Sequence, residues 1–314
     1  MDPVRVVLFA YHTFGARWLE RLLATGDTVA AVVTHADDPG EAIWFESVAD
    51  AARAHGLPVH MPVSPNTAEF VRLVRGLRPD LFLSVWYRRL LCPELLAIPR
   101  LGAVNLHGSL LPRYRGRSAL NWVLVNGEKK TGVTLHYMVA EADAGDIIAQ
   151  EEIEIDPTDT ALTLTDKLVK AGTGLFERWY PSIRAGTAPC RPQDRALATT
   201  VGQRRPEDGR VSWRRPAQEL YNLIRAVTHP FPGAFATFGG RRLFIWAARV
   251  EPEARDGAPG AVIAVRRAAG IVVAAGAGAL LLTRLALEGD SELAGDEFAA
   301  RYGLRAGDRL EDGR

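Results

Sequence analysis

The sequence predicts an α/β protein in which a doubly wound, mostly parallel sheet precedes a smaller β-barrel-like domain. Up to residue 184, β-branched runs alternate with amphipathic segments, as they do in consecutive βαβ units. After residue 230, short apolar runs follow one another with turn residues between them. Residues 187–209 separate the two patterns and are rich in Pro, Arg, Gln and Asp. We therefore expect two domains, residues 1–200 and residues 201–314.

The first domain should begin with a buried strand at residues 4–10, because a continuous β-branched run suits a strand covered on both faces. An amphipathic helix is expected next, at residues 16–24. This opening βαβ unit lacks the G-x-G-x-x-G turn of dinucleotide-binding proteins, which argues against NAD. We expect further strands at residues 28–34, 58–62, 80–87, 103–106, 131–139 and 146–155, and further helices at residues 43–55, 67–77, 93–98, 118–126 and 160–184.

The second domain should open with a helix at residues 218–227, after which Pro230, Pro232 and Gly233 force a turn. The runs beyond this turn look like the strands of a small barrel, at residues 234–238, 242–250, 260–266, 270–275 and 279–287. A last short helix is expected at residues 297–302.

The composition is that of an ordinary soluble protein, with 47% hydrophobic residues and a formal net charge of +1. This charge balance provides no global basic field of the kind that binds nucleic acid. Cys92 and Cys190 lie far apart, which suits reduced thiols and a cytoplasmic protein better than a disulfide framework. The histidines show no pairing with Cys or carboxylates at metal-ligand spacing, so we expect no metal.

Two apolar stretches are candidates for targeting or membrane segments, and neither has the required form. Residues 4–11 are too short for the apolar region of a signal peptide. Residues 268–282 are interrupted by glycines and are shorter than the roughly 18–20 residues that a bilayer span needs. We therefore expect no membrane association.

The polar residues Asn105, His107 and Asp143 stand at the ends of two expected strands. Asn105 and His107 are two residues apart, so they point to the same face of an extended chain. Asp143 lies in the acidic loop after the next strand, and open α/β sheets bind ligands at such strand ends. An amide can donate to an oxyanion, an imidazole can carry a proton, and a carboxylate can orient the imidazole. Each residue alone is more typical of core or turn chemistry, but structure does not require the combination, which therefore predicts catalysis.

Residues 105–112 (NLHGSLLP), 114–116 (YRG) and 143–145 (DAG) together resemble the signature of formyltransferases that use 10-formyltetrahydrofolate. The likeness begins at residues 6–12 (VVLFAYH), continues to residues 229–235 (HPFPGAF), and covers nearly the whole chain. It is strongest to the formyltransferase domain of the bifunctional UDP-4-amino-4-deoxy-L-arabinose formyltransferase/decarboxylases. The resemblance implies a Rossmann-like catalytic domain followed by a smaller OB-like domain.

The resemblance also implies an activity, formyl transfer from 10-formyltetrahydrofolate to the amine of a UDP-linked 4-amino sugar. This reaction belongs to lipid A modification and polymyxin resistance. Asn105 would bind the oxyanion, His107 would carry the proton, and Asp143 would orient His107 and stabilise its charged form. The chain stops at Arg314 without a second dinucleotide-binding domain, so we expect no decarboxylase activity. The identity of the nucleotide and the possibility of a homo-oligomer stay open.

Folate contacts are implied by the resemblance at three places in the sequence: the loop after residue 87, Arg117 after the motif at residues 114–116, and the loop after residue 138. The residues concerned are Arg89, Leu90, Leu91, Arg117, Val139, Ala140, Glu141, Ala142 and Asp143. Main-chain groups there would bond the pterin ring, and Leu90 and Leu91 would line its apolar edge. The leucines are equally compatible with a place in the core. Tyr137 and residues 140–141 replace basic residues that we would expect around this loop, which leaves the amino sugar open.

Three arginines are candidates for the nucleotide end of the site. Arg204, Arg205 and Arg225 can each contact a diphosphate through two parallel hydrogen bonds. The alternative is that they form a solvated basic linker.

Three other functions are compatible with parts of this pattern. A methionyl-tRNA formyltransferase would share the catalytic residues, but those proteins carry a basic insertion after the second strand. Here residues 36–41 (ADDPGE) are acidic and would repel phosphate. A formyltransferase for another nucleotide-linked amino sugar fits equally well. A folate- or nucleotide-binding module without activity would not need the proton carrier His107.

Overall fold

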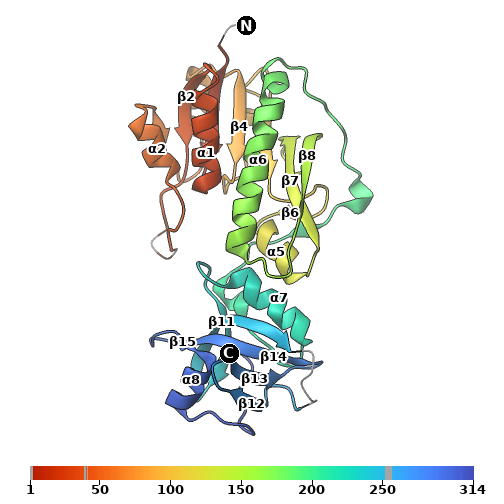
Figure 1. Ribbon diagram of the computed structural model, residues 1–314. Helices are drawn as coiled ribbons and strands as arrows, with labels where there is room; N and C mark the ends of the chain where they lie inside the picture. Colours follow the sequence, from red (N-terminus) through yellow and green to blue (C-terminus); the bar gives the residue numbers. More distant parts are fainter. Residues whose placement is uncertain (1–2, 39, 41, 252–256) are drawn as a thin grey trace. The chain divides into compact units, whose positions relative to one another are not determined.

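A computed structural model describes residues 3–38, 40, 42–251 and 257–314 (Figure 1). Two residues of the acidic segment 36–41, Pro39 and Glu41, lie outside these ranges. The chain forms two compact units, called here the first unit and the second unit. The first comprises Met1–Ala119, Lys130–Glu154 and Thr165–Gly202, and the second comprises Leu120–Lys129, Ile155–Leu164 and Gln203–Arg314.

The first unit is built on a seven-stranded sheet. Its strands are β1 (Arg5–Ala10), β2 (Thr28–Val33), β3 (Val59–His60), β4 (Leu81–Val85), β5 (Ala103–His107), β7 (Lys130–Tyr137) and β8 (Ile147–Glu154). They follow the order β3-β2-β1-β4-β5-β7-β8, parallel from β3 to β5 and antiparallel in the last two pairings. The predicted doubly wound, mostly parallel sheet is thus confirmed, with β8 at its edge.

Two long helices, α1 (His12–Leu23) and α6 (Ala161–Arg184), lie over the same face of this sheet (Figure 1). They meet where Trp18 packs on Phe176, with ring centroids 4.5 Å apart. Gly172 lets α6 approach β5 closely, because a Cβ at this position would lie 2.6 Å from Leu106 Cδ2. Burial of these large side chains fixes α6 along the sheet.

The other face of the sheet carries a second apolar layer. Val7, Phe9 and Phe82 of the strands form one core cluster with side chains of α3 (Ala68–Gly76) and α4 (Pro93–Leu96). Every second residue of these strands points to this face, as the pleat requires. Both faces are therefore apolar, which explains the continuous β-branched runs in the sequence.

Two helices begin away from their predicted positions. The helix α1 begins at His12 rather than at residue 16, directly after β1. The helix α2 (Val48–Ala54) begins at Val48 rather than at residue 43. Ser47 is its N-cap, since the Ser47 side chain accepts a hydrogen bond from the Asp50 N–H. The described residues before Ser47 therefore lie outside the helix, although their apolar spacing looked helical.

The segment 187–209 is more than a linker, because its first part is built into the first unit. Arg191 pairs with Ile147 of β8, and β9 (Thr200–Val201) forms a small parallel sheet with β6 (Arg115–Gly116). A Cβ on Gly116, whose φ is 101°, would lie 2.3 Å from the Val201 carbonyl oxygen. Residue 116 must therefore be glycine, because a side chain would clash with β9 and would disfavour this backbone conformation.

The second unit is an antiparallel sheet flanked by helices. Its elements are α7 (Ala217–Val227), β10 (Ala234–Phe238), β11 (Arg241–Glu251), β12 (Val262–Arg266), β13 (Gly270–Ala274), β14 (Ala279–Leu287), β15 (Leu293–Ala294) and α8 (Gly295–Tyr302). The order is β10-β11-β14-β13-β12, and β15 pairs with β14. The chain end closes the sheet, because Arg309 bridges to Ala261 beside β12 and Glu311 bridges to Thr237 of β10. This agrees with the expected barrel-like domain.

Two short segments from the first half of the chain belong to the second unit, which a single cut near residue 200 does not provide for. One contains most of α5 (Ala119–Val125), where Asn121 Nδ2 donates to the Ala226 carbonyl at 2.8 Å. In the other, the Pro157 carbonyl accepts from the Tyr221 hydroxyl at 2.9 Å. Within the ranges that the structure describes, no helix is both long and apolar enough to cross a bilayer.

Candidate active site

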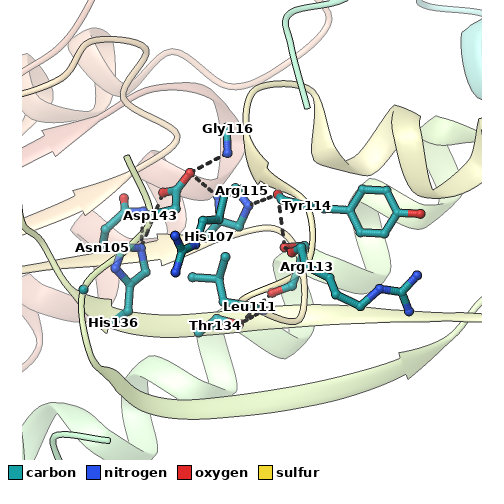
Figure 2. A network of polar contacts seen from close by, with 12 residues as sticks. Asn105, His107, Leu111, Arg113, Tyr114, Arg115, Gly116, Thr134, His136 and Asp143 are labelled. Atoms are coloured by element: carbon teal, nitrogen blue, oxygen red, sulfur yellow. Dashed lines mark hydrogen bonds and ion pairs between the residues drawn. The ribbon is translucent and has the colours of Figure 1, made fainter. Parts of the chain in front are cut away.

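Asn105, His107 and Asp143 come together at one end of the sheet (Figure 2). Asn105 and His107 both lie on β5, between β4 and β7, and His107 is buried with 8% exposure. Asp143 lies on the loop between β7 and β8 and has a φ of 53°. Aspartate tolerates this left-handed conformation better than most residues do. The loop thereby turns the Asp143 carboxylate back towards β5.

The Asp143 carboxylate has partners on both oxygens. Oδ2 accepts from the Gly116 N–H at 2.8 Å and lies 3.5 Å from His107 Nδ1. Oδ1 lies 3.6 Å from His136 Nε2. Burial alone would raise the pKa of Asp143, but the interaction with His107 and the hydrogen bond from the Gly116 N–H oppose burial, and this pKa lies well below its ordinary value. Asp143 is therefore an anion throughout the physiological pH range.

The ring of His107 is oriented by two acceptors. Nε2 lies 2.7 Å from the Tyr114 carbonyl oxygen, which can only accept, so Nε2 carries a proton and donates it there. Nδ1 faces the Asp143 carboxylate at 3.5 Å, too far for a short hydrogen bond. Nδ1 is thus the nitrogen at which a proton can be gained and lost.

His136 is a site residue that the sequence analysis missed. It is 2% exposed and lies opposite Asn105 in the register of β5 and β7. Nδ1 donates to the Tyr137 carbonyl at 2.8 Å, and Nε2 accepts from Asn105 Nδ2, 3.0 Å away. The second N–H of the Asn105 amide is left for a ligand. A single imidazole in the apolar strand 130–137 was the available signal, but its meaning depends on the strand register.

Gln193 supports the Asp143 loop from a segment that had looked like a linker. Its Nε2 donates to the carbonyl oxygens of Asp143, at 2.8 Å, and Gly145, at 2.7 Å. Its Oε1 accepts from Arg115 Nη2 at 2.8 Å, and the buried Arg115 also pairs with Glu141 at 3.2 Å. These contacts join the strand after His107 to the loop that carries Asp143.

Comparison with protein families decides what kind of site this is. The family model "Formyl transferase" matches residues 4–179, and "Formyl transferase, C-terminal domain" matches residues 204–303. The chain belongs to the formyl transferase family. Asn105, His107 and Asp143 all lie within the first matched range, and they are called the trio below.

Solved structures share the fold of this formyl transferase at low sequence identity. HypX from Aquifex aeolicus in complex with tetrahydrofolic acid is 18% identical, with a TM-score of 0.65 over 95% of this chain and 47% of HypX. The chain thus spans about half the length of HypX. The N-formyltransferase from Helicobacter canadensis, in complex with folinic acid and dTDP-3-aminofucose, is 17% identical, with a TM-score of 0.66 over 93% of this chain and 100% of that one. The sugar 3N-formyl transferase WlaRD, determined in the presence of dTDP and 5-N-formyl-THF, is also 17% identical, with a TM-score of 0.66 over 91% and 98%.

The candidate folate residues of this formyl transferase differ in exposure. Leu91 is 3% exposed and belongs to the apolar cluster behind β4, whereas Leu90 is 59% exposed. The leucine pair is therefore divided, with Leu91 in the core and Leu90 at the surface. The other candidates are exposed or half-exposed, namely Arg89, Arg117, Val139, Ala140, Glu141 and Ala142.

Arg117 stands beside two other cations. Its Nη2 donates to the Arg88 carbonyl oxygen at 3.1 Å. Burial, together with the charges of Arg88 and Arg89, lowers the pKa of Arg117. The guanidinium groups thus form a positive patch after β4, where a ligand carboxylate or phosphate would be favoured.

The candidate nucleotide arginines have structural partners within the second unit. The Arg225 Nε donates to Asn222 Oδ1, and Nη1 donates to the carbonyl oxygens of Asp156 and Asp159. Arg204 lies 4.7 Å above the Trp122 ring and donates from Nη2 to the Asp208 carbonyl. Arg205 is exposed.

The described residues contain no group of three or more His, Cys, Asp or Glu side chains that could hold a metal ion.

Proposed function

We propose that the protein transfers the formyl group of 10-formyltetrahydrofolate to the amine of a nucleotide-linked amino sugar. UDP-4-amino-4-deoxy-L-arabinose is the acceptor that the sequence resemblance favours, and it implies a cytoplasmic role in lipid A modification and polymyxin resistance. The observation that carries the proposal is the arrangement of Asn105, His107 and Asp143 at one strand end, with Asp143 held as an anion. The H. canadensis and WlaRD structures, which hold folinic acid or 5-N-formyl-THF with dTDP-3-aminofucose or dTDP, support this class of substrates.

In the proposed reaction the acceptor amine attacks the formyl carbon, and the carbonyl oxygen becomes an oxyanion. Asn105 donates its free N–H to this oxygen, while its other N–H is held by His136. An amide that is already oriented needs no reorganisation in the transition state, and such donors commonly contribute about 10²–10³ in rate.

Collapse of the tetrahedral intermediate breaks the bond between the formyl carbon and the folate nitrogen. The amine must lose one proton and the folate nitrogen must gain one. His107 carries this proton at Nδ1, the nitrogen that faces Asp143. The carboxylate stabilises the charged ring, and the Nε2 bond to the Tyr114 carbonyl fixes its orientation.

The test is a transfer assay with 10-formyltetrahydrofolate and a panel of acceptors, in which the formylated product is measured by mass spectrometry. The panel contains UDP-4-amino-4-deoxy-L-arabinose, dTDP-3-aminofucose and initiator methionyl-tRNA. We expect transfer to a nucleotide sugar. Transfer to the tRNA alone, with salt-dependent binding, would contradict the proposal, and turnover of no acceptor would leave only a binding module.

A further inference from the structure

His12 is a buried polar residue that the proposed chemistry at Asn105, His107 and Asp143 does not use. It is 4% exposed, and neither Nδ1 nor Nε2 has a hydrogen-bond partner among the residues that the structure describes. A buried imidazole without partners has lost its hydrogen bonds to water and gained none, which destabilises the fold. Departures of this kind from good packing are expected at functional sites.

The position of His12 in the sheet is one where ligands bind. His12 directly follows β1, and Trp86 directly follows β4, the parallel neighbour of β1. The order β3-β2-β1-β4-β5 reverses its direction between β1 and β4, and open α/β sheets bind ligands at such switch points. Both residues have a left-handed backbone, with φ values of 67° and 55°. Histidine is one of the residue types enriched in this conformation, whereas a bulky tryptophan rarely adopts it.

Aromatic rings surround the imidazole. The ring centroid of Phe45 lies 4.2 Å from that of His12 in a stacked arrangement, and those of Trp44 and Trp86 lie at 4.6 and 4.8 Å. Trp44 and Phe45 are half-buried and come from the irregular segment 42–47. Apolar walls with very few polar groups are typical of small-molecule sites.

This aromatic box adjoins both a hollow and the catalytic strand. Phe45 also lines a hollow of about 240 Å³, together with Tyr11, His35 and Asp37. On the other side, Trp86 Nε1 lies 3.9 Å from the position that a Cβ on Gly108 would take. Gly108 directly follows His107, so a ligand that touches Trp86 lies close to the catalytic trio.

We propose that His12 and the rings of Trp44, Phe45 and Trp86 form the subsite that receives the sugar ring of the acceptor, an inference that rests on the proposed function. The aromatic faces would stack on the C–H face of the sugar. The imidazole, with one donor and one acceptor, would bond its hydroxyl groups. Trp44 and Phe45 must turn aside for the sugar to reach His12.

The charge state of His12 suits an acceptor that carries an amine. Burial, and after it the charge of Arg88, lowers the pKa of His12 to about 3. The ring is therefore neutral at pH 7 and does not repel the protonated amine of a sugar. A cationic side chain at this position would oppose binding.

The pterin is not expected in this box, because the candidate folate residues lie elsewhere along the sheet. Residues 89–91 follow β4 and residues 139–143 follow β7, so they flank β5. His12 and Phe45 belong to the other side of β4, towards β1 and β2. The two substrates would thus approach the trio from opposite sides.

The test compares His12→Phe, His12→Asn and the control His60→Phe in the transfer assay. His60 is the last residue of β3 and is half-buried, so His60→Phe makes the same substitution at a histidine outside the box. For whichever of UDP-4-amino-4-deoxy-L-arabinose and dTDP-3-aminofucose the wild type formylates, His12→Phe should raise the acceptor KM by about 10–100-fold, as expected for two lost hydrogen bonds. The KM for 10-formyltetrahydrofolate should stay within about threefold of wild type. His12→Asn should retain more acceptor affinity, because Asn keeps a donor and an acceptor and tolerates the left-handed backbone.

The outcomes separate this inference from the proposed function. An unchanged acceptor KM in a folded, active His12→Phe variant overturns the sugar subsite and leaves the formyltransferase proposal standing. A selective rise in the folate KM assigns the box to the pterin instead. If the wild type formylates neither sugar nucleotide, the proposed function fails and the subsite fails with it.

Discussion

The proposed catalytic trio and the proposed sugar subsite around His12 lie at the same edge of the sheet, but within the described residues the polar groups of the trio have hydrogen-bond partners and those of His12 do not. Asp143 accepts from Gly116, His107 donates to Tyr114, and Asn105 donates to the ring of His136. His12 has no such partner among the described residues. Groups that perform chemistry must be held in place before the substrate arrives, whereas a group that recognises the substrate must keep its bonds for it.

The pKa values show the same contrast. Those of Asp143 and His12 both lie below the ordinary values, but for different reasons. At Asp143 the surrounding donors overcome burial and keep the carboxyl charged. At His12 burial is not compensated and keeps the imidazole neutral. One region is therefore built to hold charge, and the other is built to exclude it.

Replacing Asp143 by Asn should cause the largest loss of activity. The amide can still accept from the Gly116 N–H, but the negative charge that faces His107 Nδ1 is gone. We expect kcat to fall by up to about 10⁴-fold, as it does when the aspartate of a catalytic triad is replaced in this way. Steady-state kinetics would check this, and a fall of less than about tenfold would remove Asp143 from the mechanism.

The same variant should change how stability depends on pH. The pKa of Asp143 is depressed in the folded protein, so its carboxylate stabilises the fold above its unfolded pKa of about 3.9. This contribution is lost as pH falls below that value. Asp143→Asn should therefore be less stable than wild type at pH 7, and the difference should shrink towards pH 3. Urea unfolding at both pH values measures it, and a constant difference would point to a purely structural loop residue.

Asn105→Ala should have the next largest effect. It removes the donor to the oxyanion, so kcat should fall by about 10²–10³ with little change in either KM. His136→Phe should cost less, because it releases the Asn105 amide without removing it. Kinetics with both substrates would decide, and a change confined to the folate KM would reassign Asn105 to ground-state binding.

Gln193→Ala tests whether the position of Asp143 depends on the hydrogen bonds that Gln193 makes to the Asp143 loop. Loss of the bonds to the Asp143 and Gly145 carbonyls should loosen the loop and lower kcat by about tenfold. The exposed Gln203 provides the matched control, since Gln203→Ala should leave kcat unchanged. Equal kinetics in the two variants would show that the Asp143 loop holds its position without Gln193.

The smallest effect is expected for His12→Phe, in the way that the melting temperature depends on pH. The pKa of His12 is about 3 in the folded protein, so the unfolded chain binds the extra proton between about pH 6.5 and pH 3. Stability therefore falls as pH decreases through this range. His12→Phe should reduce the loss of Tm between pH 7 and pH 5 by a few degrees. Identical slopes in wild type and variant would mean that His12 is solvated rather than buried.

Several features were predictable from sequence because they are local. The β-branched run of β1 and the alternation of strands with amphipathic helices indicated the doubly wound sheet. Asn105 and His107 were recognisable because two residues of spacing place them on one face of a strand. The shortened α2 was not predictable from apolar spacing, since the cap at Ser47 decided where the helix begins.

Other features were decided by contacts between distant parts of the chain. His136 joins the trio through the antiparallel register of β5 and β7, and Gln193 through a segment with no periodicity. Arg225 was a candidate phosphate ligand, and in the structure it donates to Asn222 Oδ1 and to the main-chain carbonyls of residues 156 and 159. Such pairings depend on which surfaces meet after the chain has folded.

The sequence by itself determined the fold class, the family and the chemical groups at the strand ends, because periodicity and motif spacing act over a few residues. Only the tertiary structure decided which of these groups are satisfied and which are not. The partners of Asp143 are Gly116, His107 and His136, which lie 27, 36 and 7 positions away, and the partner of Asn105 lies 31 positions away. His12 ends the short motif at residues 6–12, yet its burial depends on rings at positions 44, 45 and 86. Burial and hydrogen-bond satisfaction are properties of packing, and packing joins segments that no local pattern connects.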